Sequence, residues 1–542
     1  MKRSIGVDVR IRSLVLASTL VSNLACAGLA GLAAVAGLAT SACGSTTETT
    51  SAPAPAATTT PAAPATVAAD ELAIDEVAVY QAVKVTVVKG GAVVKKLNAP
   101  IIAGRPAFVR VFVKAIGRTR PKIEAELRVT RAGKDDLILK DSGRGVLPVL
   151  DDGLLAQTLN FEIPAEDMTA DATFAVKAGV KLASGDVVAF PADGTSVPFA
   201  AKTASQKLRV TFVPVAYQSA DGTSLTPDLA DTSALKDTLF KMYPVADVEI
   251  TIHAALKWST PVAADGPGWD QLLSGILQVR KADNVDRDVY YVGVFTPKPT
   301  IDQFCDQGSC ILGIAPQADE KSVGLRAALV LGYDNRSAGG TLAQELAHAM
   351  GRAHAPCGNP AAIDGKFPYS GGSIGVFGYD LLTKELLDPG DRWRDFMSYC
   401  SPVWTSDYTF QGIYDRMEIV TTQQKAAVAA AAGTSGATGS GKSEAQLETH
   451  QSFVVSASGT IEEGPAIDVL PGETSGEHTA VAYEGAAGNV LATAQARVSS
   501  ISRTGGRIVI APRAPAGATR VRLAGIGVSR ALLGGAGRAL SR

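Results

Sequence analysis

Hydrophobic residues alternate with polar ones in short runs through the first third of the chain. Apolar-rich, partly alternating runs occupy residues 77–85, 107–113 and 172–176, and turn signals such as Gly90-Gly91 and Asp151-Asp152-Gly153 separate them. Short alternating runs between turn signals are typical of half-buried strands. We therefore predict a β-sandwich of the immunoglobulin-like kind over residues 71–202.

The pattern changes over residues 205–430, where strand-like and helix-like runs are mixed. Here the periodicity predicts strands over 208–213, 288–295 and 325–331, and helices over 269–280 and 338–351. A Gly/Ser-rich linker at 432–444 follows, and short β-like runs over 447–542 predict a second small β domain. The fold class expected for the 542 residues is multidomain α+β, with one mixed domain between two β domains.

The N-terminus has the composition of a targeting segment. Four basic residues among the first twelve precede an apolar run over residues 14–38, which ends at the small residues before Cys43. Small residues directly before a cysteine resemble a bacterial lipobox, which predicts a lipoprotein signal peptide over 1–43 and a lipid on Cys43. An ordinary cleaved signal peptide or an uncleaved membrane segment is the alternative. Residues 44–70, rich in Ser, Thr, Ala and Pro, would form a tether.

The charge balance and the leader together indicate where the protein acts. The chain has 51 Lys and Arg against 53 Asp and Glu, a formal net charge of −2. Because there is no basic field, we expect no nucleic-acid partner. The prediction is an exported protein of a bacterium, held at the membrane or cell surface through its lipid.

The residues with the strongest chemical signal are Gln344, Glu345, His348 and His354. They fit the pattern H-E-x-x-H-x-x-G-x-x-H, with Gln344 in place of the first His. Positions 344 and 348 lie on one helical face, and Gly351 allows the chain to leave the helix and bring His354 back. Beside such a face Glu345 could polarise a metal-bound water as general base. The alternative is that these are ordinary interior side chains.

A second segment strengthens the signal. Residues 395–399 read Asp-Phe-Met-Ser-Tyr, about 45 residues after the helix. With the helix motif they resemble the zinc motif and Met turn of the metzincin metalloproteases. The resemblance covers residues 205–430 and implies an apolar floor at Met397 and an oxyanion-stabilising role for Tyr399. A buried Tyr bonded to the backbone is the alternative for Tyr399.

The resemblance also implies a cofactor and a ligand. Zinc would be held by His348, His354 and, weakly, Gln344, because an amide oxygen is a poorer zinc ligand than imidazole. A polypeptide would pair with an edge strand at residues 311–315 above the motif helix, where Gly313 permits close backbone approach.

Four cysteines remain outside the leader, and they allow three pairings. Cys305 with Cys310 would close a small loop. The metzincin resemblance places Cys357 and Cys400 beside the floor of the site and so favours their pairing. Disulfides would agree with export.

Two functions from different classes follow from these residues. The first is a surface-anchored zinc metalloendopeptidase with a degenerate metal site and weak activity. The second is a catalytically inactive protein with the metzincin fold, a pseudoprotease, that acts in binding or adhesion. The retained Glu345, His348 and His354 favour the first, and the substitution at Gln344 favours the second.

Overall fold

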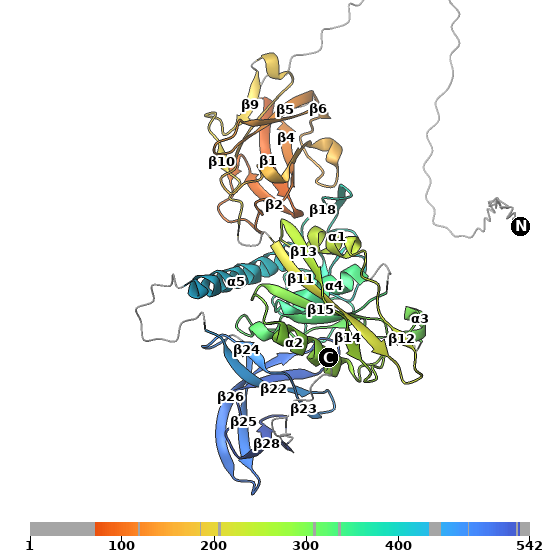
Figure 1. Cartoon of the computed structure of the whole chain (residues 1–542). Coiled ribbons are helices and arrows are strands. Elements are labelled where there is room, and N and C mark those ends of the chain that lie inside the picture. The colour runs from red at the N-terminus through yellow and green to blue at the C-terminus, as the bar shows by residue number, and fades with distance from the viewer. Residues whose placement is uncertain are drawn as a thin grey trace, which may run out of the picture. The chain divides into compact units, whose positions relative to one another are not determined.

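The computed structural model describes residues 71–117, 120–184, 186–203, 207–306, 310–333, 338–432, 446–474, 476–526 and 529–531. The predicted leader with Cys43, the tether and the linker from 433 onward lie outside these residues. The described part of the chain is a mixed α+β structure with several sheets and few helices (Figure 1). None of its described helices is both long and apolar enough to cross a membrane.

Two antiparallel sheets form the first region. The first sheet has the order β19-β18-β2-β1-β4-β7, and the second has the order β10-β8-β5-β6. The strands are β1 (Leu72–Tyr80), β2 (Ala82–Lys89), β3 (Ala92–Val93), β4 (Ala107–Ala115), β5 (Lys122–Thr130), β6 (Leu137–Gly145), β7 (Leu159–Ile163), β8 (Thr173–Gly179), β9 (Val187–Phe190), β10 (Val197–Pro198), β18 (Gly378–Asp380) and β19 (Glu385–Leu387). Inward side chains of both sheets, such as Val111 and Leu127, share one hydrophobic cluster.

Two features of this region go beyond its sequence pattern. The apolar run at 77–85 contains a reversal at Gln81, whose side-chain amide donates to the carbonyls of Ile102 (3.0 Å) and Arg105 (2.9 Å). In addition, β18 pairs with β2, so residues from beyond 202 complete the first sheet.

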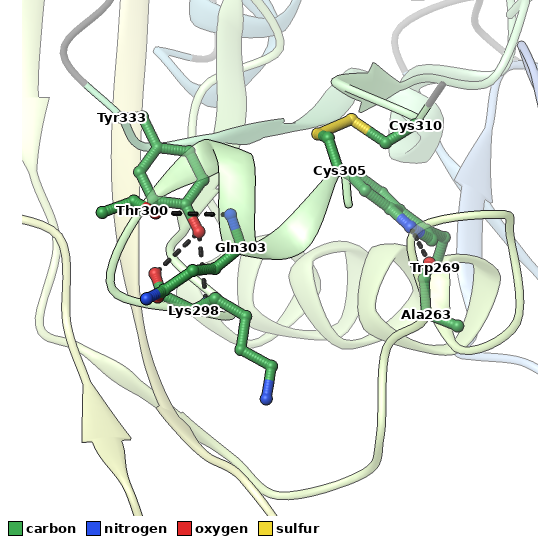
Figure 2. Close-up of a disulfide and its surroundings, with 8 residues drawn as sticks. All are labelled: Ala263, Trp269, Lys298, Thr300, Gln303, Cys305, Cys310 and Tyr333. Carbon is green, nitrogen blue, oxygen red and sulfur yellow. Dashed lines mark hydrogen bonds between the residues drawn. A yellow bond between two sulfur atoms is a disulfide. The ribbon is translucent and has the colours of Figure 1, made fainter. Parts of the chain in front are cut away.

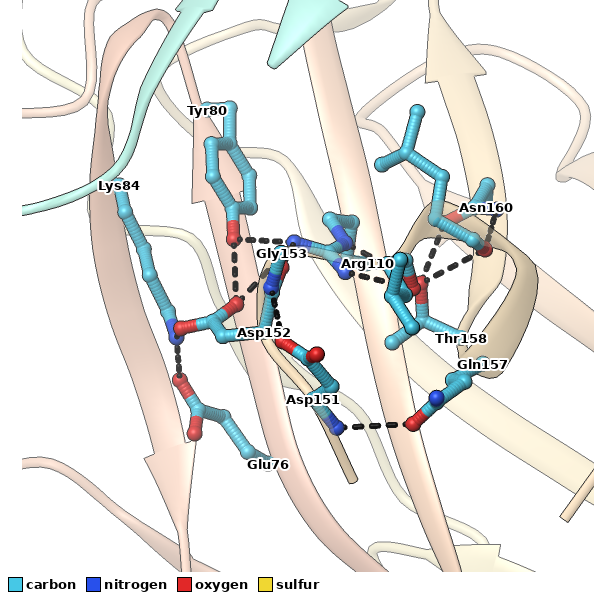
Figure 3. Close-up of polar contacts among 12 residues, drawn as sticks. Glu76, Tyr80, Lys84, Arg110, Asp151, Asp152, Gly153, Gln157, Thr158 and Asn160 are labelled. Atoms are coloured by element: carbon cyan, nitrogen blue, oxygen red, sulfur yellow. Dashed lines mark hydrogen bonds and ion pairs between the residues drawn. The ribbon is translucent and has the colours of Figure 1, made fainter. Parts of the chain in front are cut away.

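A buried charge network, the Arg110 cluster, lies on this first sheet and consists of Glu76, Tyr80, Lys84, Arg110 and Asp152 (Figure 3). Arg110 is fully buried and donates to the Asp152 carboxylate at 3.1 Å and to the Tyr80 hydroxyl at 3.1 Å. Lys84 joins Asp152 to Glu76, at 2.9 Å from the latter. Each charge therefore has an opposite charge within 3.1 Å.

A mixed sheet forms the middle region. Strands β11 (Lys207–Gln218), β15 (Val289–Phe295) and β17 (Ala327–Leu331) are parallel neighbours, and β16 (Gly313–Ile314) pairs antiparallel with β17. Strands β12 (Ser224–Leu225), β13 (Asp247–Ile252) and β14 (Leu256–Trp258) pair with β11. The predicted strands at 208–213, 288–295 and 325–331 are confirmed as β11, β15 and β17.

Helices cover both faces of this sheet. They are α1 (Ser233–Met242), α2 (Trp269–Asp283), α3 (Ile301–Phe304), α4 (Ala338–Ala349) and α5 (Asp407–Ala431). Val292 and Val294 pack in the cluster that holds α1 and α4, whereas Tyr291 and Phe295 pack in the cluster that holds α2. Strands buried on both faces explain the continuous apolar run of β15. The helices predicted at 269–280 and 338–351 are confirmed as α2 and α4.

The C-terminal region is a sheet of β22 (Glu448–Val455), β23 (Ile461–Glu463), β24 (Ile467–Val469), β25 (Glu477–Gly485), β26 (Val490–Ser500), β27 (Arg507–Ala511), β28 (Ala518–Leu523) and β29 (Ser529–Ala531). Its Ile467, Ile501 and Ile508 pack in the same hydrophobic cluster as Leu272 and Ile276 of α2. Lys281 adds an ion pair to Asp468 at 2.6 Å. A shared apolar core therefore joins this sheet to the middle region.

Both predicted disulfides are present. Cys305 and Cys310 are bonded with Cα atoms 5.2 Å apart, beside Trp269 and the Tyr333–Lys298 contact (Figure 2). Cys357 and Cys400 are bonded with Cα atoms 5.7 Å apart. These bonds are compatible with an extracellular protein.

Candidate functional site

Helix α4 brings Gln344, Glu345 and His348 together on its buried side. The three side chains are 4%, 0% and 3% exposed. The helix ends at Ala349, and in the turn that follows Gly351 has a φ of 83° and the Arg352 amide donates to the Ala347 carbonyl at 2.9 Å. A Cβ at Gly351 would lie 2.9 Å from the backbone oxygen of Ala318, so both the left-handed backbone and the close packing favour glycine here.

The turn after Gly351 places His354 against His348, as the motif predicts. Their Nε2 atoms are 3.1 Å apart. The Nδ1 of His348 lies 2.7 Å from the Arg352 carbonyl, and the Nδ1 of His354 lies 2.6 Å from the Ala361 carbonyl. Because a carbonyl oxygen only accepts, each Nδ1 must carry a hydrogen. In the neutral rings both Nε2 atoms therefore present lone pairs to each other.

The pair is neutral at physiological pH. Burial lowers the pKa of His348 to about 4 and that of His354 to about 4. His348 adds to the lowering of the His354 pKa and Arg503 contributes to the lowering of both, while the carbonyl contacts oppose the shift. Two lone pairs at this distance repel unless a cation or a proton lies between them, so the arrangement favours a bound cation.

Glu345 is fully buried, and its partners come from the C-terminal sheet. The Ser502 hydroxyl donates to Oε2 at 2.7 Å. The Arg503 Nε lies 3.4 Å from Oε1, close enough for an ion pair, but Oε1 has no hydrogen-bond donor. Burial raises the pKa of Glu345, and Arg503 and Ser502 oppose the rise.

Gln344 is turned toward the same arginine. Its Oε1 accepts from the Arg503 guanidinium at 2.7 Å, and its amide donates to the Ser398 carbonyl at 3.3 Å. The oxygen that would be a metal ligand is therefore bonded to a cationic side chain.

The segment with Met397 and Tyr399 lies beneath the histidines. Met397 is 1% exposed, and its carbonyl accepts from the Ala355 amide at 3.0 Å. The Tyr399 ring packs edge-on against His354, with centroids 4.9 Å apart, and the Arg503 guanidinium lies 4.2 Å from the centre of the Tyr399 ring. The Cys357–Cys400 disulfide connects the two chain segments that carry these side chains.

Asp395 organises that segment from beneath. The carboxylate is fully buried and accepts from the Met397 amide at 2.8 Å and from the Ser406 amide at 3.0 Å. Ser406 is the N-cap of α5 and accepts from the Thr409 amide. Burial raises the pKa of Asp395 despite these bonds. Asp395 therefore fixes the loop under the site to the start of α5.

The edge strand is where the sequence predicts it, but it is already paired. Gly313 of β16 lies against α4, where a Cβ would come within 2.8 Å of the Glu345 side chain. Just beyond β16, the Ser502 amide donates to the Ala315 carbonyl at 2.9 Å, and the Gln317 amide donates to the Ser500 carbonyl at 2.8 Å. The turn between β26 and β27 thus continues along this edge.

The residues fit a zinc site only in part. Two zinc-bound nitrogens in a tetrahedral site would lie about 3.3 Å apart, near the 3.1 Å between the histidines. However, the Gln344 oxygen faces Arg503. Among the described residues, no three His, Cys, Asp or Glu side chains converge to hold a metal. The histidine pair fits a metal, and the complete three-ligand set does not.

A cavity of about 1400 Å³ opens beside the site. Gln344, Tyr399 and Arg503 line it together with other polar residues such as Asp228, Asp231 and Lys241, and its apolar lining includes Leu312, Phe396 and Trp404. It is large enough for several side chains of a bound chain.

A scan of the chain against models of known protein families finds no match, and a search of curated proteins finds none either. The assignment of a function therefore rests on the geometry of the site.

The motifs in the sequence predict that α4, the turn after it and the 395–399 segment meet, and the structure brings these segments together. The residues concerned are Gln344, Glu345, His348, His354, Met397 and Tyr399. The sequence predicts no role for Ser502 and Arg503, which are more than 150 residues away along the chain. No motif marks them. The available signal was the pair Gly505-Gly506, two residues after Arg503, which marks a turn and nothing more.

Proposed function

We propose that residues 205–430 are a metzincin-type peptidase scaffold that serves as a polypeptide-binding module, with little or no peptide hydrolysis. The observation that carries this proposal is the position of Arg503, which contacts both Gln344 and Glu345. Arg503 and Ser502 oppose the rise in the Glu345 pKa that burial causes, so they make this carboxylate a weaker general base than burial alone would, and an amide oxygen bonded to arginine is a poor metal ligand.

Two features support a polypeptide as the ligand. The edge beyond β16 accepts an extended segment by main-chain hydrogen bonds, since Ser500 and Ser502 already use it in that way. The neighbouring cavity is lined by both apolar and polar side chains, so it offers surface for the side chains and the main chain of a peptide. The ligand would be an extended chain whose side chains enter the cavity.

A surface-anchored zinc metalloendopeptidase is the second candidate, and the histidine pair favours it. Backbone carbonyls that fix both Nδ1 atoms are the usual support of zinc-binding histidines. In that case His348 and His354 would hold the zinc with Gln344 as a weak third ligand. The metal would polarise a water beside Glu345, and Tyr399 lies close enough to contribute.

Metal content and turnover of the purified protein separate the two. We expect well under one zinc per chain by elemental analysis and no cleavage of casein. Position 344 lies on the same face of α4 as His348, so a histidine there would complete a three-histidine site. In Gln344→His we therefore expect about one zinc per chain. Stoichiometric zinc in the unaltered protein, together with cleavage lost in Glu345→Ala, would instead establish the endopeptidase.

The placement of the protein is part of the proposal. We propose a lipid on Cys43 that holds the protein at a bacterial membrane or cell surface. Mass spectrometry of the mature N-terminus is expected to show a lipid-modified Cys43, and an unmodified terminus elsewhere would disprove it.

A further inference from the structure

The Arg503 guanidinium lies in a cage that suits its chemistry. The Gln344 Oε1 accepts from Nη2 at 2.7 Å, the Glu345 Oε1 faces Nε at 3.4 Å, and the Tyr399 ring lies 4.2 Å beneath the guanidinium carbon. An amide oxygen, a carboxylate and an aromatic face are the groups that recognise the planar, multiply donating guanidinium. We define these three side chains as the guanidinium cage.

Arg503, which lies in the turn between β26 and β27, has a strained backbone. Its φ is 62°, in the left-handed region that a residue with a side chain rarely adopts. Such a conformation costs about 1 kcal/mol or more unless its surroundings impose it. The turn also pairs with the edge of the middle sheet, with an antiparallel bridge between Ile501 and Pro316. Strand pairing and strain together aim Arg503 into the cage.

The turn therefore has the properties of a bound ligand. It is an extended segment on the sheet edge. Its Ser502 amide donates to the Ala315 carbonyl, and its Ser502 hydroxyl accepts from the Ala315 amide. The next side chain, that of Arg503, enters a pocket between the sheet edge and α4. The fit is incomplete, since Glu345 Oε1 and Arg503 Nε have no hydrogen-bond partner. The cavity of about 1400 Å³ continues from the cage, so space for a larger ligand is present.

We propose that the cleft recognises an extended polypeptide carrying an arginine, and that the β26–β27 turn fills this site in cis and limits access to it. This inference rests on the proposed polypeptide-binding function and names its ligand class. An external peptide and the β26–β27 turn compete for the guanidinium cage and for the edge of the middle sheet beyond β16. The unaltered protein therefore binds such peptides weakly.

The first experiment tests the cage alone. In Arg503→Ala, ethylguanidinium at millimolar concentration is expected to raise the thermal midpoint saturably, whereas ethylammonium has no such effect because it lacks the planar donors. The unaltered protein and Arg513→Ala, in which an exposed arginine is removed, should not respond. An equal response to both compounds, or no difference between Arg503→Ala and the unaltered protein, overturns the cage.

The second experiment tests the polypeptide. Ser500 and Arg507 are the last pair of the β26–β27 ladder, so residues 501–506 can be replaced by Asn-Gly, a two-residue hairpin turn. This variant is expected to bind a blocked peptide of residues 500–505 at least tenfold more tightly than the unaltered protein does. The same peptide with lysine for arginine should bind at least tenfold more weakly to the variant.

The outcomes separate this inference from the proposed function. Equal binding of the arginine and lysine peptides would overturn the arginine preference and leave polypeptide binding in place. Cleavage of the bound arginine peptide, lost in Glu345→Ala, would keep the inference and replace the non-catalytic function by the endopeptidase. If loop replacement does not increase binding of the peptide, the turn does not occupy the site as a ligand and the inference fails.

Discussion

The Arg110 cluster and the Arg503 site each place an arginine against a carboxylate, with Arg110 fully buried and Arg503 partly exposed, yet their polar groups are satisfied to different degrees. In the Arg110 cluster every charge has an opposite charge within 3.1 Å, and all the partners lie in the first β region. In the Arg503 site a fully buried carboxylate oxygen has no hydrogen-bond donor, and the arginine comes from another sheet. Complete satisfaction is typical of a structural network, and incomplete satisfaction is typical of a ligand site.

The pKa values of the buried carboxylates differ between the two sites in the same way. Burial alone would raise the pKa of Glu76, but Lys89 and Lys84 hold it below its usual value. In Glu345 the same burial is opposed by Arg503 and Ser502 and still prevails, so its pKa is raised. Charge pairing therefore offsets desolvation in the first cluster and fails to do so in the second.

Removal of the arginine should therefore reduce the free energy of unfolding more in the Arg110 cluster than in the Arg503 site. Arg110→Ala would remove the buried donor that Asp152 and Tyr80 share and leave Asp152 with only its contacts to Lys84 and the Tyr80 hydroxyl. We expect the free energy of unfolding to fall by about 3 kcal/mol, at the lower end of the cost of breaking a buried ion pair, because Lys84 still faces the partly exposed Asp152. Urea unfolding measures this loss. A loss below about 1 kcal/mol would mean that water replaces the guanidinium, contrary to the comparison.

The second prediction concerns pH in metal-free protein. His348 has a pKa lowered from about 6.5 to about 4, so the unfolded chain takes up a proton that the folded chain refuses. Stability is complete above pH 6.5 and falls as the pH drops toward 4, by about 3 kcal/mol for one histidine. The groups facing His348 and His354 are Glu345, Tyr399 and Arg503. The raised pKa of Glu345 acts in the opposite sense because its folded form binds a proton more readily.

Unfolding with a chelator present at pH 7, 5.5 and 4.5 measures this dependence. His348→Gln removes one of the two titrating rings and should make the pH dependence less steep over this interval, with the remainder due to His354. If the slope is unchanged in that variant, the histidine pair is not the source of the acid sensitivity. The stability that the ion-paired Glu76 contributes is lost at lower pH. Its pKa in the folded protein lies below the usual 4.5, so this contribution is present above pH 4.5 and falls as the carboxylate is protonated below it.

How far the sequence could predict this molecule depends on the range of the interactions. Periodicity gave β11, β15, β17, α2 and α4 correctly because those elements are decided by local alternation and by burial on known faces. Motif spacing placed His348 against His354 because a helix turn and a glycine fix that geometry. The pairing of β18 with β2 and the docking of Ser502 and Arg503 depend on contacts across more than 150 residues, which leave no periodic signal.

The third prediction tests whether Arg503 and a metal ion exclude each other. Gln344→His supplies the missing imidazole, but the guanidinium would still place a positive charge beside it. Adding Arg503→Ala should increase the zinc affinity of Gln344→His by about tenfold or more, equivalent to about 1.4 kcal/mol. Competition with a fluorescent chelator measures the affinity, and Arg513→Ala in the same background is the control. Equal affinities with and without Arg503 would show that the arginine lies too far from the metal position to matter.

The smallest expected effect separates the strain in the turn from the contacts of the side chain. Arg503→Ala and Arg503→Gly both remove the guanidinium from the cage, so both leave Glu345 without its ion pair. They differ at φ 62°, which glycine adopts freely and alanine does not. We therefore expect Arg503→Gly to be more stable than Arg503→Ala by about 1 kcal/mol in urea unfolding. If the alanine variant is as stable as the glycine variant, the turn relaxes once its side chain is removed. The strain would then be imposed by the cage itself, as in a ligand held by its binding site, and not by the hairpin between β26 and β27.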